Sequence, residues 1–306
     1  MISRLLIILS LGFWTTNVLA NEPLKIVTSF SILQDITQNI VGDKAKVSTI
    51  VPANTDAHSY NLTPKNMVEV EKADLLIISG LGFEGFMERY LTTSGYTQKL
   101  ITASTGIKVL APDNLDVASH EHIEHEHMPN RGADPHVWQN PLNGLIYVDN
   151  IVKALCAKDA TNCPYYTQNA TKYKSEITQL DTKYSQIFKA ISEPSRAMIT
   201  THDAFNYMAK RYDIKVYSPL GLDNNSEATA KNYLLIKTLL TSGKVTAIFL
   251  ENIANNRIIE NIESSTGLKQ TATPVLYSDA LSTDPEANTY LKFLDYNLKT
   301  VSSSMH

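Results

Sequence analysis

Short runs rich in β-forming residues alternate with helical patterns along most of this chain, and this alternation constrains the fold more than any other feature. In the first half the runs are Leu24–Thr28, Ala45–Val51, Asp74–Ser79 and Ile107–Leu110. In the second half they are Ala197–Thr201, Ile214–Ser218, Thr246–Leu250 and Val275–Tyr277. Strands that alternate with helices favour parallel sheets. We therefore predict an α/β fold of two lobes, each with a parallel four-stranded sheet flanked by helices.

A long helical stretch separates the two series of strands. Helices are expected over Pro141–Lys158 and Pro164–Ala190. In the second, apolar side chains recur every three or four residues and mark one face: Tyr173, Ile177, Leu180, Tyr184 and Ile187. Such a helix would be about 40 Å long, enough to run the length of a lobe. We predict that it forms a rather rigid spine joining the lobes, with a cleft between them.

The first residues have the order of a secretory signal peptide. Arg4 precedes the apolar run Leu5–Leu9, and the small-residue pattern Val18–Ala20 precedes polar Asn21. Charged, apolar and small residues in that order are typical of an export signal. A membrane anchor is disfavoured, because a spanning helix needs about 20 mostly apolar residues and Thr15–Asn17 interrupt this stretch. We expect cleavage near Ala20.

The mature chain is expected in the periplasm. No cysteine follows the predicted cleavage site, which disfavours a lipid-attached surface protein. We predict four segments: a signal peptide at 1–20, an N-terminal lobe at 21–163 with a histidine-rich loop at 120–127, a linker helix at 164–192 and a C-terminal lobe at 193–306. Cys156 and Cys163 lie close together in sequence, and in an oxidising compartment a disulfide is favoured over two buried thiols.

Composition excludes two broad classes of protein. With 43% hydrophobic and 19% charged residues, the chain is typical of a folded protein and not of a disordered one. The net charge is −4, and no basic stripe interleaved with aromatic residues occurs, so a nucleic-acid partner is not expected.

Histidines and carboxylates follow the predicted strands at one edge of the sheets. In open parallel sheets, ligands bind outside the carboxyl ends of the strands. The candidates at these ends are His58, His136, His202, Asp279 and Glu251. Taken singly, His202 could cap a helix and Asp279 could form a turn. Their joint placement indicates a metal site, whose imidazoles and carboxylate suit zinc or, with wider coordination, manganese or iron.

A second histidine feature lies between the fourth predicted strand and His136. Histidine and glutamate alternate there, with His120, His122, His125 and His127 as the candidate metal-binding side chains. Such a tract reads as a solvated loop that binds zinc-like metals loosely. It is either a collector or sensor of metal near the cleft, or a linker without a function.

Several ordered motifs resemble the zinc/manganese solute-binding proteins of bacterial ABC importers, the TroA-like zinc-uptake type. The motifs are Ile26–Phe30, Val51-Pro52, Asp56–Tyr60 with Pro64, Asp134–Trp138, His202–Tyr207 and Tyr277–Leu281. The resemblance implies two lobes joined by one long helix, with the metal between them. It implies His58, His136, His202 and Asp279 as ligands, and Glu251 as an acidic group that supports the site without binding the metal.

The resemblance also implies the partners and tilts the choice of metal. The partners would be a membrane permease and a separate ATPase subunit, and the chain itself would be a monomer. Manganese-selective relatives often carry glutamate where this chain has His202, and zinc-binding relatives often have a histidine-rich insertion near 120–127. Both features favour Zn²⁺ over Mn²⁺ as the transported ion.

Three other readings stay open at this point. The first is a manganese-selective carrier of the same family. The second is a secreted zinc hydrolase that uses His58, His136 and His202 with Glu251 as the base. A carboxylate as fourth ligand would close the water position that catalytic zinc sites keep, so we expect no enzyme. The third, an adhesin or passive metal buffer, is disfavoured by the absence of repeats and of a lipid-attachment cysteine.

Overall fold

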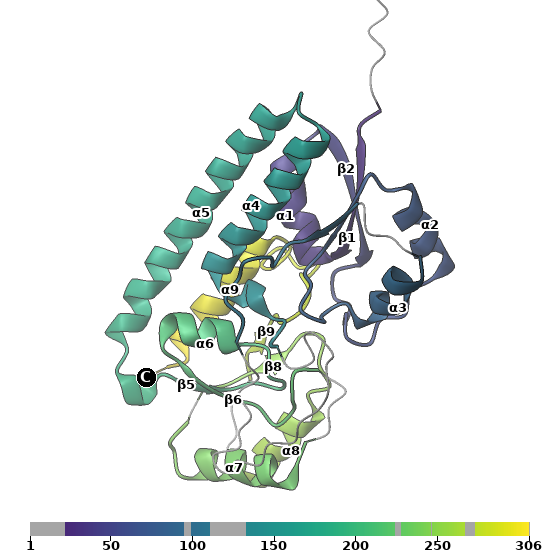
Figure 1. Cartoon of the computed structure of the whole chain (residues 1–306). Helices are drawn as coiled ribbons and strands as arrows, with labels where there is room; N and C mark the ends of the chain where they lie inside the picture. Colours follow the sequence, from purple (N-terminus) through teal and green to yellow (C-terminus); the bar gives the residue numbers. More distant parts are fainter. Residues whose placement is uncertain are drawn as a thin grey trace, which may run out of the picture.

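The computed structural model describes residues 22–94, 99–110, 133–223, 228–245, 247–266 and 273–305. The predicted signal peptide and the histidine-rich tract at 120–127 lie outside these residues. Two parallel sheet regions with flanking helices are joined by a long helix, as Figure 1 shows. Within the described residues, no helix has the length and hydropathy of a membrane span.

The first sheet contains four parallel strands in the order β2-β1-β3-β4. The strands are β1 (Leu24–Phe30), β2 (Ala45–Val51), β3 (Leu75–Ile78) and β4 (Leu100–Thr102), and the helices between them are α1 (Ser31–Val41), α2 (Pro64–Lys72) and α3 (Gly85–Ser94). All residues of β3 are buried, as expected for a central parallel strand covered on both faces. Thr63 starts α2, because its hydroxyl accepts the Asn66 amide at 3.2 Å and Pro64 follows it.

The fourth strand of this sheet was wrongly predicted at Ile107–Leu110. The strand is β4, a half-buried edge strand of only three residues, which carries little pattern of its own. The apolar run that follows is irregular chain. Its first amide closes a turn onto Ser104 O at 3.0 Å, and its last residue pairs with Asp134 N at 3.0 Å. Of its four residues only Ile107 is buried, and Val109 is 39% exposed.

All four strands predicted in the second half are present, but the third is divided in two, so the second half has five strands among the described residues. The strands are β5 (Ala197–Ile199), β6 (Lys215–Tyr217), β7 (Ala247–Ile248), β8 (Leu250–Glu251) and β9 (Val275–Leu276), and the helices are α6 (Asn206–Tyr212), α7 (Ala230–Thr241) and α8 (Arg257–Thr266). Instead of one four-stranded sheet, there is a three-stranded β6-β5-β7 sheet and a two-stranded β8-β9 sheet.

The division falls at Phe249, and hydrogen bonds show its origin. The Phe249 amide donates to Ile199 O at 2.9 Å, whereas the Leu250 amide donates to Pro274 O at 2.9 Å. Successive amides of a strand face opposite neighbours, so one short segment serves as the link between the two ladders. The two ladders share no residue, because Ala247 and Ile248 pair with β5, and Leu250 and Glu251 pair with β9.

The predicted spine is α5 (Cys163–Ala190), a helix of 28 residues that packs against α4 (Pro141–Lys158). Cys156 and Cys163 form the predicted disulfide, with their Cα atoms 4.6 Å apart. Tyr173 and Ile177 pack into the core of the first sheet, whereas Tyr184 packs with Phe188 in a core of the second half. The predicted apolar face is wrong at its end, because Ile187 is 38% exposed and Phe188 is buried instead.

The last helix, α9 (Tyr290–Ser303), also touches both halves. Phe293 and Leu294 pack in the same core as β1 and α1, whereas Leu298 and Val301 pack in the core that surrounds α6. The helix contacts both α1 and α5, and it lies behind α4 in Figure 1. Two helices, α5 and α9, therefore bind the halves together, where sequence analysis identified only the first.

Candidate metal site

The four predicted ligands come together at the carboxyl ends of the strands. One possible ligand atom from each of His58, His136, His202 and Asp279 lies within 4.8 Å of all the others. His58 follows β2, His136 precedes the short helix Val137–Gln139, His202 follows β5 and Asp279 follows β9. Three of these side chains are fully buried, and the imidazole of His58 is 10% exposed. The structure thus assembles the predicted set; that the set binds metal stays a prediction.

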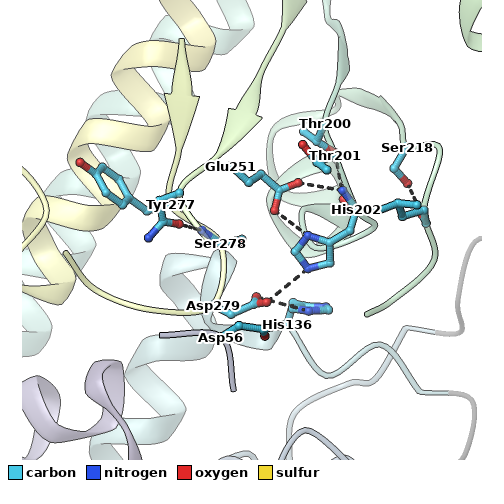
Figure 2. Close-up of polar contacts among 12 residues, drawn as sticks. Asp56, His136, Thr200, Thr201, His202, Ser218, Glu251, Tyr277, Ser278 and Asp279 are labelled. Carbon is cyan, nitrogen blue, oxygen red and sulfur yellow. Dashed lines mark hydrogen bonds and ion pairs between the residues drawn. The ribbon is translucent and has the colours of Figure 1, made fainter. Parts of the chain in front are cut away.

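Asp279 lies at the centre of the group. Its Oδ2 is 3.3 Å from Nε2 of both His58 and His202, and its Oδ1 is 3.4 Å from His136 Nε2. Figure 2 shows the carboxylate between the last two rings. Among the described residues, neither oxygen has a well-aligned hydrogen-bond donor, although Asp279 is completely buried. A buried carboxylate without a well-aligned hydrogen-bond donor is costly, and a cation held jointly with the imidazoles would lower that cost.

Two of the imidazoles are held from behind by carboxylates. His136 Nδ1 lies 2.9 Å from Asp134 Oδ1, and His202 Nδ1 lies 2.5 Å from Glu251 Oε2. A carboxylate at Nδ1 favours the tautomer with its proton there, so the lone pair of Nε2 faces Asp279. Glu251 also accepts the backbone amide of His202 at 2.8 Å. With a metal ion bound, this arrangement would keep the proton of each ring on Nδ1 and leave both Nε2 atoms to donate to the ion.

The charges of the group depend strongly on one another. Although burial disfavours its charged form, the Glu251 and Asp279 carboxylates raise the pKa of His202 well above its ordinary value of 6.5. Burial acts against ionisation of Asp279 as well, but His202 and His136 hold its pKa well below the ordinary 3.8. Burial and the nearby Asp134 carboxylate raise the pKa of Asp203 to about 6. A metal ion entering this group would therefore displace a proton from His202.

Aromatic rings cover the first-half histidines. The Phe83 ring lies 5.1 Å from the His58 ring, and the Trp138 ring lies 5.4 Å from the His136 ring, between ring centroids. Phe83 and Trp138 are themselves 4.6 Å apart and are buried. These rings exclude water from one side of the group, which strengthens electrostatic interactions inside it.

Glu251 lies where a supporting role requires it and not where a base would stand. Both of its oxygens face His202, on the side away from Asp279, as Figure 2 shows.

The matching carboxylate behind His136, Asp134, was not predicted from the sequence, although a local signal was present. In both Asp56-Ala57-His58 and Asp134-Pro135-His136 the aspartate accepts the backbone amide of the histidine two residues later at 2.9 Å. Aspartate commonly forms such turns.

Comparison with known proteins identifies the family. The model of the family described as "ZnuA: Zinc-uptake complex component A periplasmic" matches residues 26–304. The chain belongs to the ZnuA family.

Individual members agree with this assignment over nearly the whole chain. The metal ABC transporter substrate-binding lipoprotein FimA of Streptococcus parasanguinis is 29% identical, over 94% of this chain and 90% of FimA. The iron-binding protein YfeA of Yersinia pestis is 28% identical, over 91% of this chain and 85% of YfeA. The Mn-bound periplasmic metal-binding protein of Candidatus Liberibacter asiaticus is similar in structure, with a TM-score of 0.78, 28% identity and coverage of 92% and 99% of the two chains.

Membership confirms the resemblance predicted from the motifs, together with the α/β fold. ZnuA-family proteins are substrate-binding components of metal ABC transporters and are not enzymes, so the hydrolase reading is excluded. A transporter of this class implies a permease and an ATPase as partners.

Proposed function

We propose that this chain captures zinc in the periplasm with high affinity and delivers it to the permease of an ABC importer whose ATPase is a separate subunit. The observation that carries the proposal is the convergence of three imidazole Nε2 atoms on one buried carboxylate. The proposed ligands are His58, His136, His202 and Asp279. Three nitrogens and one oxygen form a closed set that suits tetrahedral zinc.

The choice of zinc rests on the donor atoms. Manganese favours carboxylate and other oxygen ligands in a larger shell, whereas imidazole suits zinc. Only Asp279 offers oxygen toward the common point, because Glu251 faces the opposite side of His202. The family description names zinc uptake. Manganese is the second candidate, since similar structures are Mn-bound. The relative YfeA is named for iron.

The proposed location and state follow from several features. The sequence has a predicted signal peptide at 1–20 with cleavage near Ala20, and the disulfide fits an oxidising compartment.

The proposed boundaries remain 21–163 for the N-terminal lobe, 164–192 for the linker helix and 193–306 for the C-terminal lobe. The carrier is proposed to act as a monomer, with His120, His122, His125 and His127 as an auxiliary metal-collecting loop.

A competition experiment tests the function. The mature chain, purified without an affinity tag and stripped of metal, is dialysed against equimolar zinc and manganese and then analysed for metal. We expect one tightly held zinc ion per chain, and little metal in the His136→Ala variant. Preferential retention of manganese would overturn the choice of zinc. Unchanged metal content in His136→Ala would overturn the site itself.

A further inference from the structure

A completely buried carboxylate outside the proposed ligand set, Asp134, contacts His136 at two points. Asp134 Oδ1 lies 2.9 Å from the backbone amide and 2.9 Å from the ring Nδ1 of His136. Asp56 accepts the backbone amide of His58 in the same way as in the first contact. The second contact, with Nδ1, involves the His136 ring itself. Asp134 is thus placed to fix the ring orientation of His136 as well as the local turn.

Helix α6 of the other half holds this carboxylate in place. Asn206 Nδ2 donates to Asp134 Oδ2 at 3.1 Å, and the Tyr207 hydroxyl donates to Asp134 O at 2.9 Å. The same hydroxyl accepts the Leu110 amide at 3.0 Å, and Asp134 N donates to Leu110 O at 3.0 Å. Asp134 therefore has partners at both carboxylate oxygens and at both of its backbone polar groups.

The residues that hold Asp134 lie four and five residues after His202, which supplies another proposed ligand. His202 precedes α6 by four residues, and Asn206 and Tyr207 open that helix. One continuous segment of the second half therefore carries His202 and also fixes the orientation of His136 in the first half. Displacement of this segment would disturb both imidazoles together.

We propose that Asp134, held by Asn206 and Tyr207, is a positioning residue that orients His136 and increases its strength as a zinc donor. This inference rests on the proposed function of the site. Its chemical basis is that a carboxylate at the far nitrogen of a metal-binding imidazole fixes the tautomer and raises ligand basicity. The contact also becomes stronger on metal binding, because the imidazole N–H is then more acidic and a buried anion gains a cationic neighbour.

Asp134→Asn is the central test. Asparagine keeps the size of the side chain and an oxygen for the turn, but it removes the charge at Nδ1. We expect zinc affinity to fall by about 10- to 100-fold, the usual cost of losing such a partner. Affinity is measured by competition with a chromogenic chelator on the folded mature chain. The visible absorption spectrum of the Co²⁺-loaded protein should change as well, since the ligand geometry around the ion changes.

Variants of α6 provide a second, milder perturbation with a matched control. Tyr207→Phe removes the hydroxyl that holds Asp134, and we expect a loss of zinc affinity of roughly three- to tenfold. Tyr212→Phe removes another buried hydroxyl of α6, which donates to Asp181 Oδ1 at 3.0 Å in the spine helix. We expect this control to lower the melting temperature without changing zinc affinity or the Co²⁺ spectrum.

The outcomes separate the inference from the function on which it rests. Wild-type affinity and spectrum in Asp134→Asn, with binding lost in His136→Ala, would overturn only the positioning role. Equal losses in Asp56→Asn and Asp134→Asn would reduce the role of Asp134 to forming the turn. If Asp134→Asn does not fold, Tyr207→Phe and Asn206→Ala decide, and wild-type binding in both would overturn the inference. Unchanged binding in His136→Ala would overturn the proposed function instead.

Discussion

The loops that carry Asp279 and His202 both belong to the second half of the sequence, yet they are attached to different parts of the molecule. The Asp279 loop is hydrogen-bonded to the first half on both sides of Asp279. Before it, Ser278 O accepts from Trp138 Nε1 and Gln139 Nε2 at 2.8 Å each. After it, Leu281 N donates to Ser31 Oγ at 3.0 Å, and Leu281 O accepts from Asn54 N at 2.8 Å. The backbone of His202 is held within its own half, by Glu251 Oε1 and by the Thr200 hydroxyl at 3.0 Å.

This difference divides the proposed ligands three to one. His58, His136 and Asp279 form one unit through the cross-links of the Asp279 loop, and His202 comes to them from the other side. Position in the chain is therefore a poor guide to which ligands stay together. The segment that carries His202 meets this unit through the contacts of Asn206 and Tyr207 with Asp134, so the distance of His202 from the other three depends on that junction.

Removing Asp279 should have the largest effect, since it is the centre of the group and its only proposed anionic ligand. In Asp279→Ala we expect zinc affinity to fall by roughly 100- to 1,000-fold, as when one partner of a buried charged pair is removed. Chelator competition measures the loss. Asp279→Asn, which keeps the shape and one oxygen, should lose less. A deficit in Asp279→Ala no greater than that in His202→Ala would contradict the central position of the carboxylate.

Changing the ligand from the second half should alter selectivity more than stability. In His202→Glu a harder oxygen replaces nitrogen, so the ratio of zinc to manganese affinity should fall. The new carboxylate would face Glu251, and two buried like charges disfavour each other. The double variant His202→Glu with Glu251→Gln should therefore bind manganese more tightly than His202→Glu alone. Paired titrations with the two metals provide the measurement, and an unchanged ratio would remove His202 as a selectivity determinant.

Because Glu251 and Asp279 raise the pKa of His202, the stability of the metal-free fold and the affinity for zinc should change in opposite directions with pH. The pKa of His202 is raised above 6.5, so its ionised contacts stabilise the metal-free fold fully below that pH and progressively less as pH rises through the folded pKa. Zinc must displace the same proton, so its affinity should rise over the same range. Thermal melts with and without zinc should diverge as pH increases. Glu251→Gln should make both the stability of the metal-free fold and the zinc affinity depend less on pH, and it should weaken zinc binding by about tenfold. An increase in melting temperature on zinc binding that is the same at all pH values would contradict the role of the His202 proton.

The smallest effect is expected from deleting 120–127. If the three-ligand unit and His202 form a complete site, the affinity of that site should stay at its wild-type value, although the total number of loosely bound zinc ions per chain should decrease. Equilibrium dialysis over a wide range of zinc concentrations distinguishes the two classes of site. Loss of tight binding on this deletion alone would move the site to the histidine-rich tract.

Most of the candidate site could be predicted from the sequence because parallel strands bring their carboxyl ends to one edge. This rule placed His58, His136, His202, Asp279 and Glu251 at one edge, although the strand predicted before His136 is absent, and the resemblance then implied the first four as ligands. The attachment of Asp279 to the first half was not predictable, since it depends on contacts such as Leu281 N to Ser31 Oγ across 250 residues. Asp134 was missed because an aspartate near a histidine reads as a turn until the ring contact is seen.

Errors in the fold have similarly local causes. Ile107–Leu110 was predicted as a strand because it is short and apolar, but it does not pair with β3, and only Ile107 in it is buried. At the end of α5, spacings of three and four residues fit either Ile187 or Phe188 as the last member of the buried face. They do not determine which of the two is buried, because the face shifts around the helix along its length. The division at Phe249 could not be read from an apolar run, because it depends on which neighbouring segment the Phe249 and Leu250 amides meet.

The passage of α9 through both cores gives the chain an unusual order of completion. A ribosome produces the first half first, but the core around β1 and α1 includes Tyr290, Phe293 and Leu294, close to the chain's end. Contacts between such distant residues form late, because closing a long loop costs entropy before it is rewarded. The half that is made first is thus completed only when α9 has been made, and a chain that stops before residue 290 would lack residues of both cores, including Leu298 and Val301 in the second half. Full-length synthesis is built into the fold as a condition for forming the site.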